Sequence, residues 1–132
     1  MNTKEIIRLA LAARDSAYSP YSKFSVGAAL LCSSGKIYTG CNIESASYSP
    51  TCCAERVAFF KAVSEGEREF CAIAILGGAQ GNKPTSFCSP CGVCRQVMSE
   101  FCDDSFKIIL ARTEEDFKVM TLGDLLPMRF EL

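Results

Sequence analysis

Residues 70–76 read Phe-Cys-Ala-Ile-Ala-Ile-Leu. This apolar run is typical of a strand buried on both faces of a sheet. A helix is predicted to begin near Pro90 or Cys91 and to run to about residue 101, and a second apolar strand is predicted over 106–111. Strand, helix and strand in this order predict a right-handed crossover between parallel strands. These residues therefore favour an α/β fold.

The segments on either side extend this sheet. Further helices are predicted over 3–16, with Thr3 as the cap, over 52–64 and over 122–126. Further strands are predicted over 25–32, 36–41 and 117–120, and residues 77–89 are predicted to form one long loop. This alternation predicts a sheet covered by helices on both faces. A length of 132 residues predicts one domain spanning 1–132.

Composition and charge narrow the class of partner. The formal net charge is −1 and there is no basic stripe, which argues against nucleic acid and favours a small substrate. No apolar run approaches the ~20 residues that a membrane span needs, so no membrane association is expected. The N-terminus leads directly into an amphipathic helix without a signal peptide, so we expect a cytoplasmic protein. The hydrophobic fraction of 48% fits a chain that also buries surface against copies of itself.

Nine cysteines and no histidine make the cysteine pattern unusual. A disulfide scaffold is disfavoured by the odd count and by the expected reducing compartment. The six cysteines outside the motifs described next are expected to be small core residues. These are Cys32, Cys41, Cys52, Cys71, Cys88 and Cys102.

Two short motifs carry the chemistry. Residues 51–56 read Thr-Cys-Cys-Ala-Glu-Arg, and residues 90–95 read Pro-Cys-Gly-Val-Cys-Arg. A catalytic zinc takes three protein ligands and leaves a fourth position open for water, and Cys53, Cys91 and Cys94 can supply the three. Both motifs fall at predicted helix N-termini, where the partial positive charge lowers thiol pKa values.

Two neighbouring charged residues complete the predicted site. Glu55 lies two residues after a ligand and can move protons without binding the metal. Three thiolates leave a zinc site with a negative formal charge, and Arg56 is the candidate that returns positive charge to it.

Two other interpretations of the cysteines compete with this one. Cys52 could join the three ligands in a closed structural site, although adjacent cysteines are poorly placed to bind one ion together. Cys53 could act as a covalent nucleophile, which is disfavoured because the chain has no histidine to serve as its base.

The two motifs resemble the signature of zinc-dependent nucleoside and nucleobase deaminases, in the all-cysteine form of the small homotetrameric cytidine deaminases. The resemblance spans nearly the whole chain. It includes Tyr-Ser-Pro-Tyr-Ser-Lys-Phe at 18–24, Val-Gly-Ala-Ala-Leu at 26–30, Gly-Cys-Asn-Ile-Glu at 40–44 and Leu-Leu-Pro at 125–127 with Phe130. It implies a three-layer α/β/α sandwich with a five-stranded mixed sheet, one Zn²⁺ per chain and a homotetramer with shared active sites.

The resemblance also assigns roles to individual residues. Glu55 would take a proton from a zinc-activated water and deliver protons to N3 and to the departing amino group, and Arg56 would hydrogen-bond the ligand thiolates. The expected substrate contacts are Phe24 against the pyrimidine, Asn42 and Glu44 at the ribose, and the backbones of Ala54, Ser89 and Cys91 at the base. Tyr48 and Phe130 would reach the site of a neighbouring subunit.

The activity implied is hydrolytic deamination of cytidine and 2'-deoxycytidine to uridine and 2'-deoxyuridine, with release of ammonia, in pyrimidine salvage. Three alternatives remain: a deaminase of a cytosine-nucleoside antibiotic such as blasticidin S, a polynucleotide-editing deaminase, and a non-catalytic zinc module. The plain ribose contacts implied for Asn42 and Glu44 disfavour the antibiotic substrate, and the net charge disfavours the polynucleotide.

Overall fold

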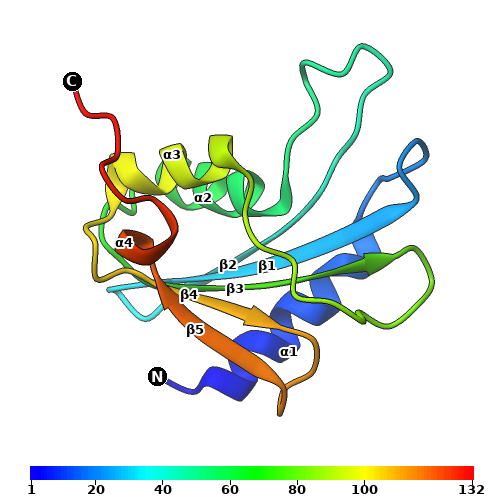
Figure 1. The fold of residues 1–132 in the computed structure, drawn as a ribbon, viewed down its shortest axis with the longest axis horizontal. Coiled ribbons are helices and arrows are strands. Elements are labelled where there is room, and N and C mark those ends of the chain that lie inside the picture. Colours follow the sequence, from blue (N-terminus) through cyan, green and yellow to red (C-terminus); the bar gives the residue numbers. More distant parts are fainter.

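A computed structural model describes residues 1–132. The helices and strands follow one another in an order close to the predicted one (Figure 1). They are α1 (Thr3–Ala13), the 3-10 turn η1 (Arg14–Ser16), β1 (Phe24–Cys32), β2 (Ile37–Cys41), α2 (Ala54–Ser64), β3 (Phe70–Ala79), α3 (Gly92–Phe101), β4 (Lys107–Ala111), β5 (Phe117–Thr121) and α4 (Leu122–Leu125).

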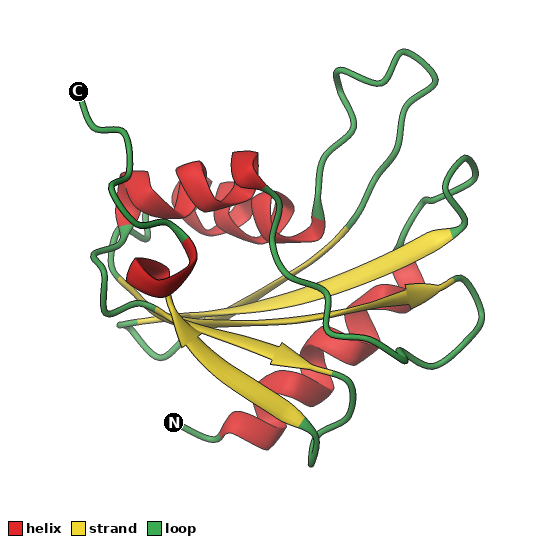
Figure 2. Cartoon of the chain, viewed as in Figure 1, coloured by secondary structure: helices red, strands yellow, loops and turns green.

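The five strands form one mixed sheet in the order β2-β1-β3-β4-β5. The pair β3–β4 is parallel and is connected through α3, whereas the other three pairs are antiparallel. Helices α2 and α3 cover one face of the sheet and α1 covers the other (Figures 1 and 2). The expected three-layer α/β/α sandwich with a five-stranded mixed sheet is therefore confirmed.

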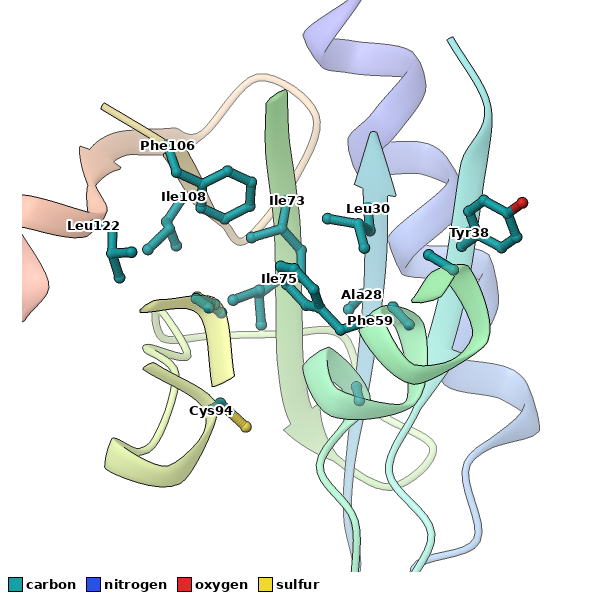
Figure 3. Packing of buried hydrophobic residues seen from close by; sticks show 14 of the residues in the cluster. Ala28, Leu30, Tyr38, Phe59, Ile73, Ile75, Cys94, Phe106, Ile108 and Leu122 are labelled. Atoms are coloured by element: carbon teal, nitrogen blue, oxygen red, sulfur yellow. The ribbon is translucent and has the colours of Figure 1, made fainter. Parts of the chain in front are cut away.

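Alternation along the two central strands sorts the core onto two faces. Leu30 of β1 and Ile73 and Ile75 of β3 belong to the larger cluster beneath α2 and α3, which also buries Phe59 (Figure 3). Their sequence neighbours, such as Ala29, belong to a smaller cluster against α1. Successive side chains of a strand point to opposite faces, so the long apolar run of β3 is explained by burial on both sides.

Several boundaries differ from the predictions. The helix predicted over 3–16 ends at Ala13 and continues as η1, and α2 begins at Ala54 rather than at residue 52. Two further differences have a clear physical cause. Asn2, rather than Thr3, caps α1, because its side-chain oxygen accepts a hydrogen bond from the backbone N–H of Glu5 at 3.1 Å. Strand β3 continues to Ala79, through residues 77–79 of the predicted long loop. Gly77 and Gly78 remain in the strand because they pair with the first residues of β1. Glycine composition pointed to a loop, but pairing with a neighbouring strand decided the outcome.

The prediction that all six remaining cysteines fill the core is wrong. Cys32 is buried, but Cys71 is exposed and the other four are partly buried. Cys71 is the second residue of β3, where the pairing with β1 is irregular. All nine cysteines are free thiols. None of the helices has the length and apolar character that crossing a bilayer requires.

Candidate metal centre and active site

The three candidate metal ligands lie at the N-terminal ends of two neighbouring helices. Cys53 is the N-cap residue of α2, Cys91 is the N-cap residue of α3, and Cys94 lies in the first turn of α3. Both N-cap residues have extended backbone conformations and make no side-chain capping hydrogen bond. The positive ends of both helix dipoles therefore face the same cluster of sulfur atoms, which favours thiolates there.

The geometry of these sulfur atoms fits a zinc ion. The Sγ of Cys91 lies 3.8 Å from that of Cys53 and 3.5 Å from that of Cys94, and all three atoms lie within 4.8 Å of one another. Tetrahedral zinc with Zn–S bonds of about 2.3 Å separates its sulfur ligands by ~3.8 Å. Three ligands leave a fourth tetrahedral position for another group. The triad is therefore suited to one Zn²⁺.

Cys52 does not join this cluster. Its backbone forms an isolated antiparallel bridge with Ile43, which keeps it in the loop between β2 and α2. A closed site with four cysteines is thus not the arrangement that the chain adopts.

Arg56 places a positive charge beside the cysteine triad. Its Nη2 donates a hydrogen bond to the Sγ of Cys53 at 3.3 Å, and its Nε is buried without a partner. Hydrogen bonds from Cys94 and from Arg56, acting against burial, lower the pKa of Cys53 to about 5. Burial alone would lower the pKa of Arg56, but its bonds to Cys53 and Cys94 raise it. Arg56 is therefore a cation in contact with Cys53.

Glu55 is the buried carboxyl group of the site. It is 4% exposed and lies in the first turn of α2. Burial, reinforced by the negative charge on Cys53, raises the pKa of Glu55 to about 7. A carboxyl group with a pKa near neutrality can both accept and donate a proton, which is the property a general acid and base needs.

Phe24 is the first residue of β1 and is 41% exposed. It lies near the side chain of Cys88, and sequence reasoning did not place Cys88 at the site. A Cβ on Gly77 would lie 2.8 Å from the Sγ of Cys88 and 2.9 Å from Cε2 of Phe24. Both side chains therefore occupy space that a larger residue at position 77 would fill. Burial raises the pKa of Cys88 to about 11, with further contributions from Glu55 and Cys53. The sequence signal that could have placed Cys88 near the site is its position three residues before Cys91.

Asn42 and Glu44 both bind the segment that leads into β1. The side chain of Asn42 accepts a hydrogen bond from the backbone N–H of Val26 at 2.9 Å and donates one to the carbonyl of Phe24 at 2.8 Å. Glu44 accepts from the backbone N–H groups of Tyr21 and Ser22, each at 3.1 Å.

The hydroxyl of Ser22 also donates to Glu44, and this bond is the first of those that lower the pKa of the carboxyl group. These bonds order the chain around Phe24. Sequence reasoning did not find this role for Asn42 and Glu44.

The residues expected to contact the base through their backbones lie beside the ligands. Ala54 is buried at the start of α2, and Ser89 is exposed two residues before Cys91. Arg95, which was assigned no role, fixes this second segment. Its Nε donates to the carbonyl of Pro90 at 2.7 Å, and its Nη1 donates to the carbonyl of Leu125, the last residue of α4, at 2.6 Å.

The two residues expected to serve a neighbouring subunit are not packed into their own chain. Tyr48 is 78% exposed with φ of 63°, in the long loop between β2 and α2 that projects from the body of the protein (Figure 1). Phe130 is 67% exposed, although Gln96 of α3 donates a hydrogen bond to its carbonyl at 3.0 Å.

Comparisons with known proteins agree with this geometry. Residues 1–110 match the family described as "Cytidine and deoxycytidylate deaminase zinc-binding region". The chain is 50% identical over 130 residues to a cytidine deaminase of Sporosarcina psychrophila, covering 98% of this chain and 92% of that protein. It superimposes on the crystal structure of cytidine deaminase from Burkholderia pseudomallei with a TM-score of 0.86 and 45% identity, covering 96% and 97% of the two chains.

A more distant relative bears on the antibiotic alternative. The blasticidin-S deaminase of Bacillus cereus is 31% identical over 114 residues, covering 83% of this chain and 79% of that protein. Its identity is well below the 50% found for the S. psychrophila cytidine deaminase. From the zinc-binding cysteine triad and these matches together, the chain belongs to the cytidine and deoxycytidylate deaminase family.

Proposed function

We propose that this protein catalyses the zinc-dependent hydrolytic deamination of cytidine and 2'-deoxycytidine to uridine and 2'-deoxyuridine, releasing ammonia, in pyrimidine salvage. One observation carries the proposal: three cysteine thiols suited to one Zn²⁺ lie beside a buried glutamate. The similarity to proteins named cytidine deaminase supports a cytosine nucleoside as the substrate.

The proposed chemistry exchanges the C4 amino group of the base for a water oxygen. When bound by Cys53, Cys91 and Cys94, zinc would lower the pKa of water at its open position. Glu55 takes one proton from the attacking water and passes it to N3 of the base. It then takes the proton of the hydroxyl newly formed on C4 and passes it to the amino group, so that the C4–N bond breaks, ammonia leaves and a carbonyl remains at C4. Burial of Glu55, which holds its pKa near neutrality, supports both directions of proton transfer.

Substrate binding is proposed to use the residues around the metal ligands. Phe24 would pack against the pyrimidine, and the backbones of Ala54, Ser89 and Cys91 would bind its polar edge. Asn42 and Glu44 would bind the ribose hydroxyls with the donor and acceptor capacity that their bonds to residues 21–26 leave free.

The proposed assembly is a homotetramer with shared active sites. The exposed Tyr48 and Phe130 are available to reach the site of a neighbouring subunit. A Phe130→Ala variant should then raise the KM for cytidine and weaken assembly, measured by sedimentation. Unchanged KM and assembly would argue against this role. The free state of all nine cysteines is in keeping with the proposed cytoplasmic location.

The decisive test measures uridine and ammonia formed from cytidine, with zinc assayed on the same sample. A Glu55→Gln variant should keep its zinc and lose turnover by about 10³-fold, the range expected for loss of general acid–base catalysis. Glu100→Gln, at an exposed carboxylate of α3, is the matched control and should retain full activity. Unaltered turnover in Glu55→Gln would refute the mechanism. Turnover of blasticidin S in place of cytidine would identify the antibiotic deaminase instead.

A further inference from the structure

Arg14 is a buried cation that the proposed chemistry does not use. It is 9% exposed, lies where α1 gives way to η1, and forms no salt bridge within 4.0 Å. Its guanidinium instead donates to main-chain carbonyls. Its Nε bonds Ser25 at 2.8 Å, and its Nη2 lies 3.1 Å from Gly78, 3.1 Å from Asn82 and 3.4 Å from Ala79.

Burying a charge in this way is costly unless its hydrogen bonds are satisfied. Burial lowers the pKa of Arg14, which reflects that cost. The planar guanidinium can bond several acceptors in fixed directions, whereas an ammonium group cannot present the same fork. The carbonyls that it bonds belong to two separate segments, the start of β1 and the end of β3 with the turn that follows. Arg14 therefore holds these two segments together.

These two segments carry Phe24 and Gly77, which lie on the side of the sheet that faces the metal ligands. Phe24 pairs with Ala79 and Ser25 pairs with Gly78 at the ends of β1 and β3. Because side chains alternate along a strand, Phe24 and Gly77 face the side of the zinc ligands, whereas Ser25 and Gly78 face α1. The guanidinium thus bonds the strand ends on the face of the sheet that α1 covers, which is the face opposite Phe24.

The close approach of α1 to the sheet allows Arg14 to make these hydrogen bonds. A Cβ on Gly27 would lie 2.0 Å from the carbonyl of Ala10 and 2.9 Å from Cγ of Arg14. Glycine at this position lets the end of α1 sit against β1 and brings the guanidinium within hydrogen-bond distance of the strand ends. Along the side of β1 that pairs with β2, Asn42 also bonds the carbonyl of Phe24, so Arg14 and Asn42 both hold this segment.

We propose that Arg14 is a positioning residue for the nucleoside pocket, which it serves by fixing the two strand ends that carry Phe24 and Gly77. This inference rests on the proposed function, because Phe24 is assigned there to the pyrimidine. Arg14 touches neither the metal ligands nor the substrate. Its loss should therefore weaken nucleoside binding and leave the proton transfers of Glu55 and the binding of zinc in place.

The test compares Arg14→Gln and Arg14→Lys with Arg68→Gln in the full-length, zinc-loaded protein. Arg68 is the matched control because it also donates to main-chain carbonyls, those of Val63 and Glu67, between α2 and β3. Steady-state kinetics with cytidine would give KM and kcat separately. Amide hydrogen exchange would report the protection of residues 22–26 and 77–83 without reference to activity.

In Arg14→Gln we expect KM for cytidine to rise about tenfold with kcat within about twofold, and exchange to increase at these two segments but not in α3. Arg14→Lys should recover part of the KM, and Arg68→Gln should change neither reading. An unchanged KM, an equal effect in Arg68→Gln, or loss of protection throughout the sheet would overturn the proposal. If the wild type does not deaminate cytidine, the proposed function fails. Amide hydrogen exchange in the two Arg14 variants still decides whether Arg14 holds the ends of β1 and β3 together.

Discussion

A methyl group added at Gly40 should damage the metal centre through the backbone of α2. Gly40 lies in β2, and a Cβ there would lie 2.2 Å from the carbonyl of Ala54 and 2.7 Å from the backbone nitrogen of Ala58. Real Cβ contacts do not fall below 3.0 Å, so the carbonyl must retreat to at least that distance. Ala54 directly follows the ligand Cys53. The first turn of α2 therefore cannot keep its position.

The size of this shift sets the expected loss. Metal–ligand distances tolerate deviations of only about 0.2 Å, and the retreat from 2.2 Å to 3.0 Å is several times larger. In Gly40→Ala we expect zinc affinity to fall by about 10–100-fold. We also expect turnover of cytidine to fall by about 100-fold, because Glu55 moves with the same helix turn. Overpacking should reduce the free energy of unfolding by about 1–3 kcal/mol.

Gly27→Ala provides the matched control. Its Cβ would lie 2.0 Å from the carbonyl of Ala10, so it forces α1 rather than α2 away from the sheet. Zinc affinity would be measured by competition with a chromophoric chelator, and unfolding would be followed by circular dichroism. Both variants should unfold at lower temperature, and only Gly40→Ala should lose zinc affinity. A folded Gly40→Ala protein that binds zinc as tightly as the wild type would refute the reasoning.

Three further outcomes follow from contacts in the site and the core. Arg56→Lys keeps the charge but not the guanidinium that bonds Cys53, so zinc should dissociate faster to a chelator; an unchanged rate would contradict this. Asn42→Ala removes two bonds to the β1 backbone and should cost about 1–3 kcal/mol in urea unfolding, and an unshifted midpoint would count against it. In the zinc-loaded protein at pH 8, Cys71 should be alkylated first, because it is the exposed cysteine outside the metal-binding triad. Burial raises the pKa of Cys102 to about 12, so its thiolate is scarce and its labelling should accelerate as pH rises. Mass spectrometry would measure the labelling of each cysteine, and equal labelling rates for Cys71 and Cys102 would contradict this prediction.

Most of the fold could be predicted because its signals are local. The apolar run of β3, the helix start near Cys91 and the apolar run at 106–111 predicted the crossover. The end of β3 could not be predicted in this way. Two glycines favour a loop by composition, but their partners in β1 lie about fifty residues away in sequence, and pairing between distant segments leaves no local pattern.

In the candidate site too, the residues in local motifs could be predicted, whereas contacts between distant segments could not. The metal ligands and Glu55 could be found because zinc requires particular residue types at short spacings, and the cysteine triad is confirmed as a cluster. The hydrogen bonds from Arg14 to main-chain carbonyls could not be predicted from the sequence, because every residue type supplies a backbone carbonyl. The burial of Cys71 was predicted wrongly, because an apolar run does not reveal where the pairing with a neighbouring strand becomes irregular.

The spacing of the ligands has a consequence for the unfolded chain. Cys53 and Cys91 are 38 residues apart, and the segment between them contains all of α2 and all of β3. A metal that bridges them closes a loop of that length, much as a disulfide would. In the chain-entropy description, such a closure removes about 4 kcal/mol of conformational freedom from the denatured ensemble. The ion would thus act as a reversible cross-link between the two helices, and its removal would return that entropy to the chain.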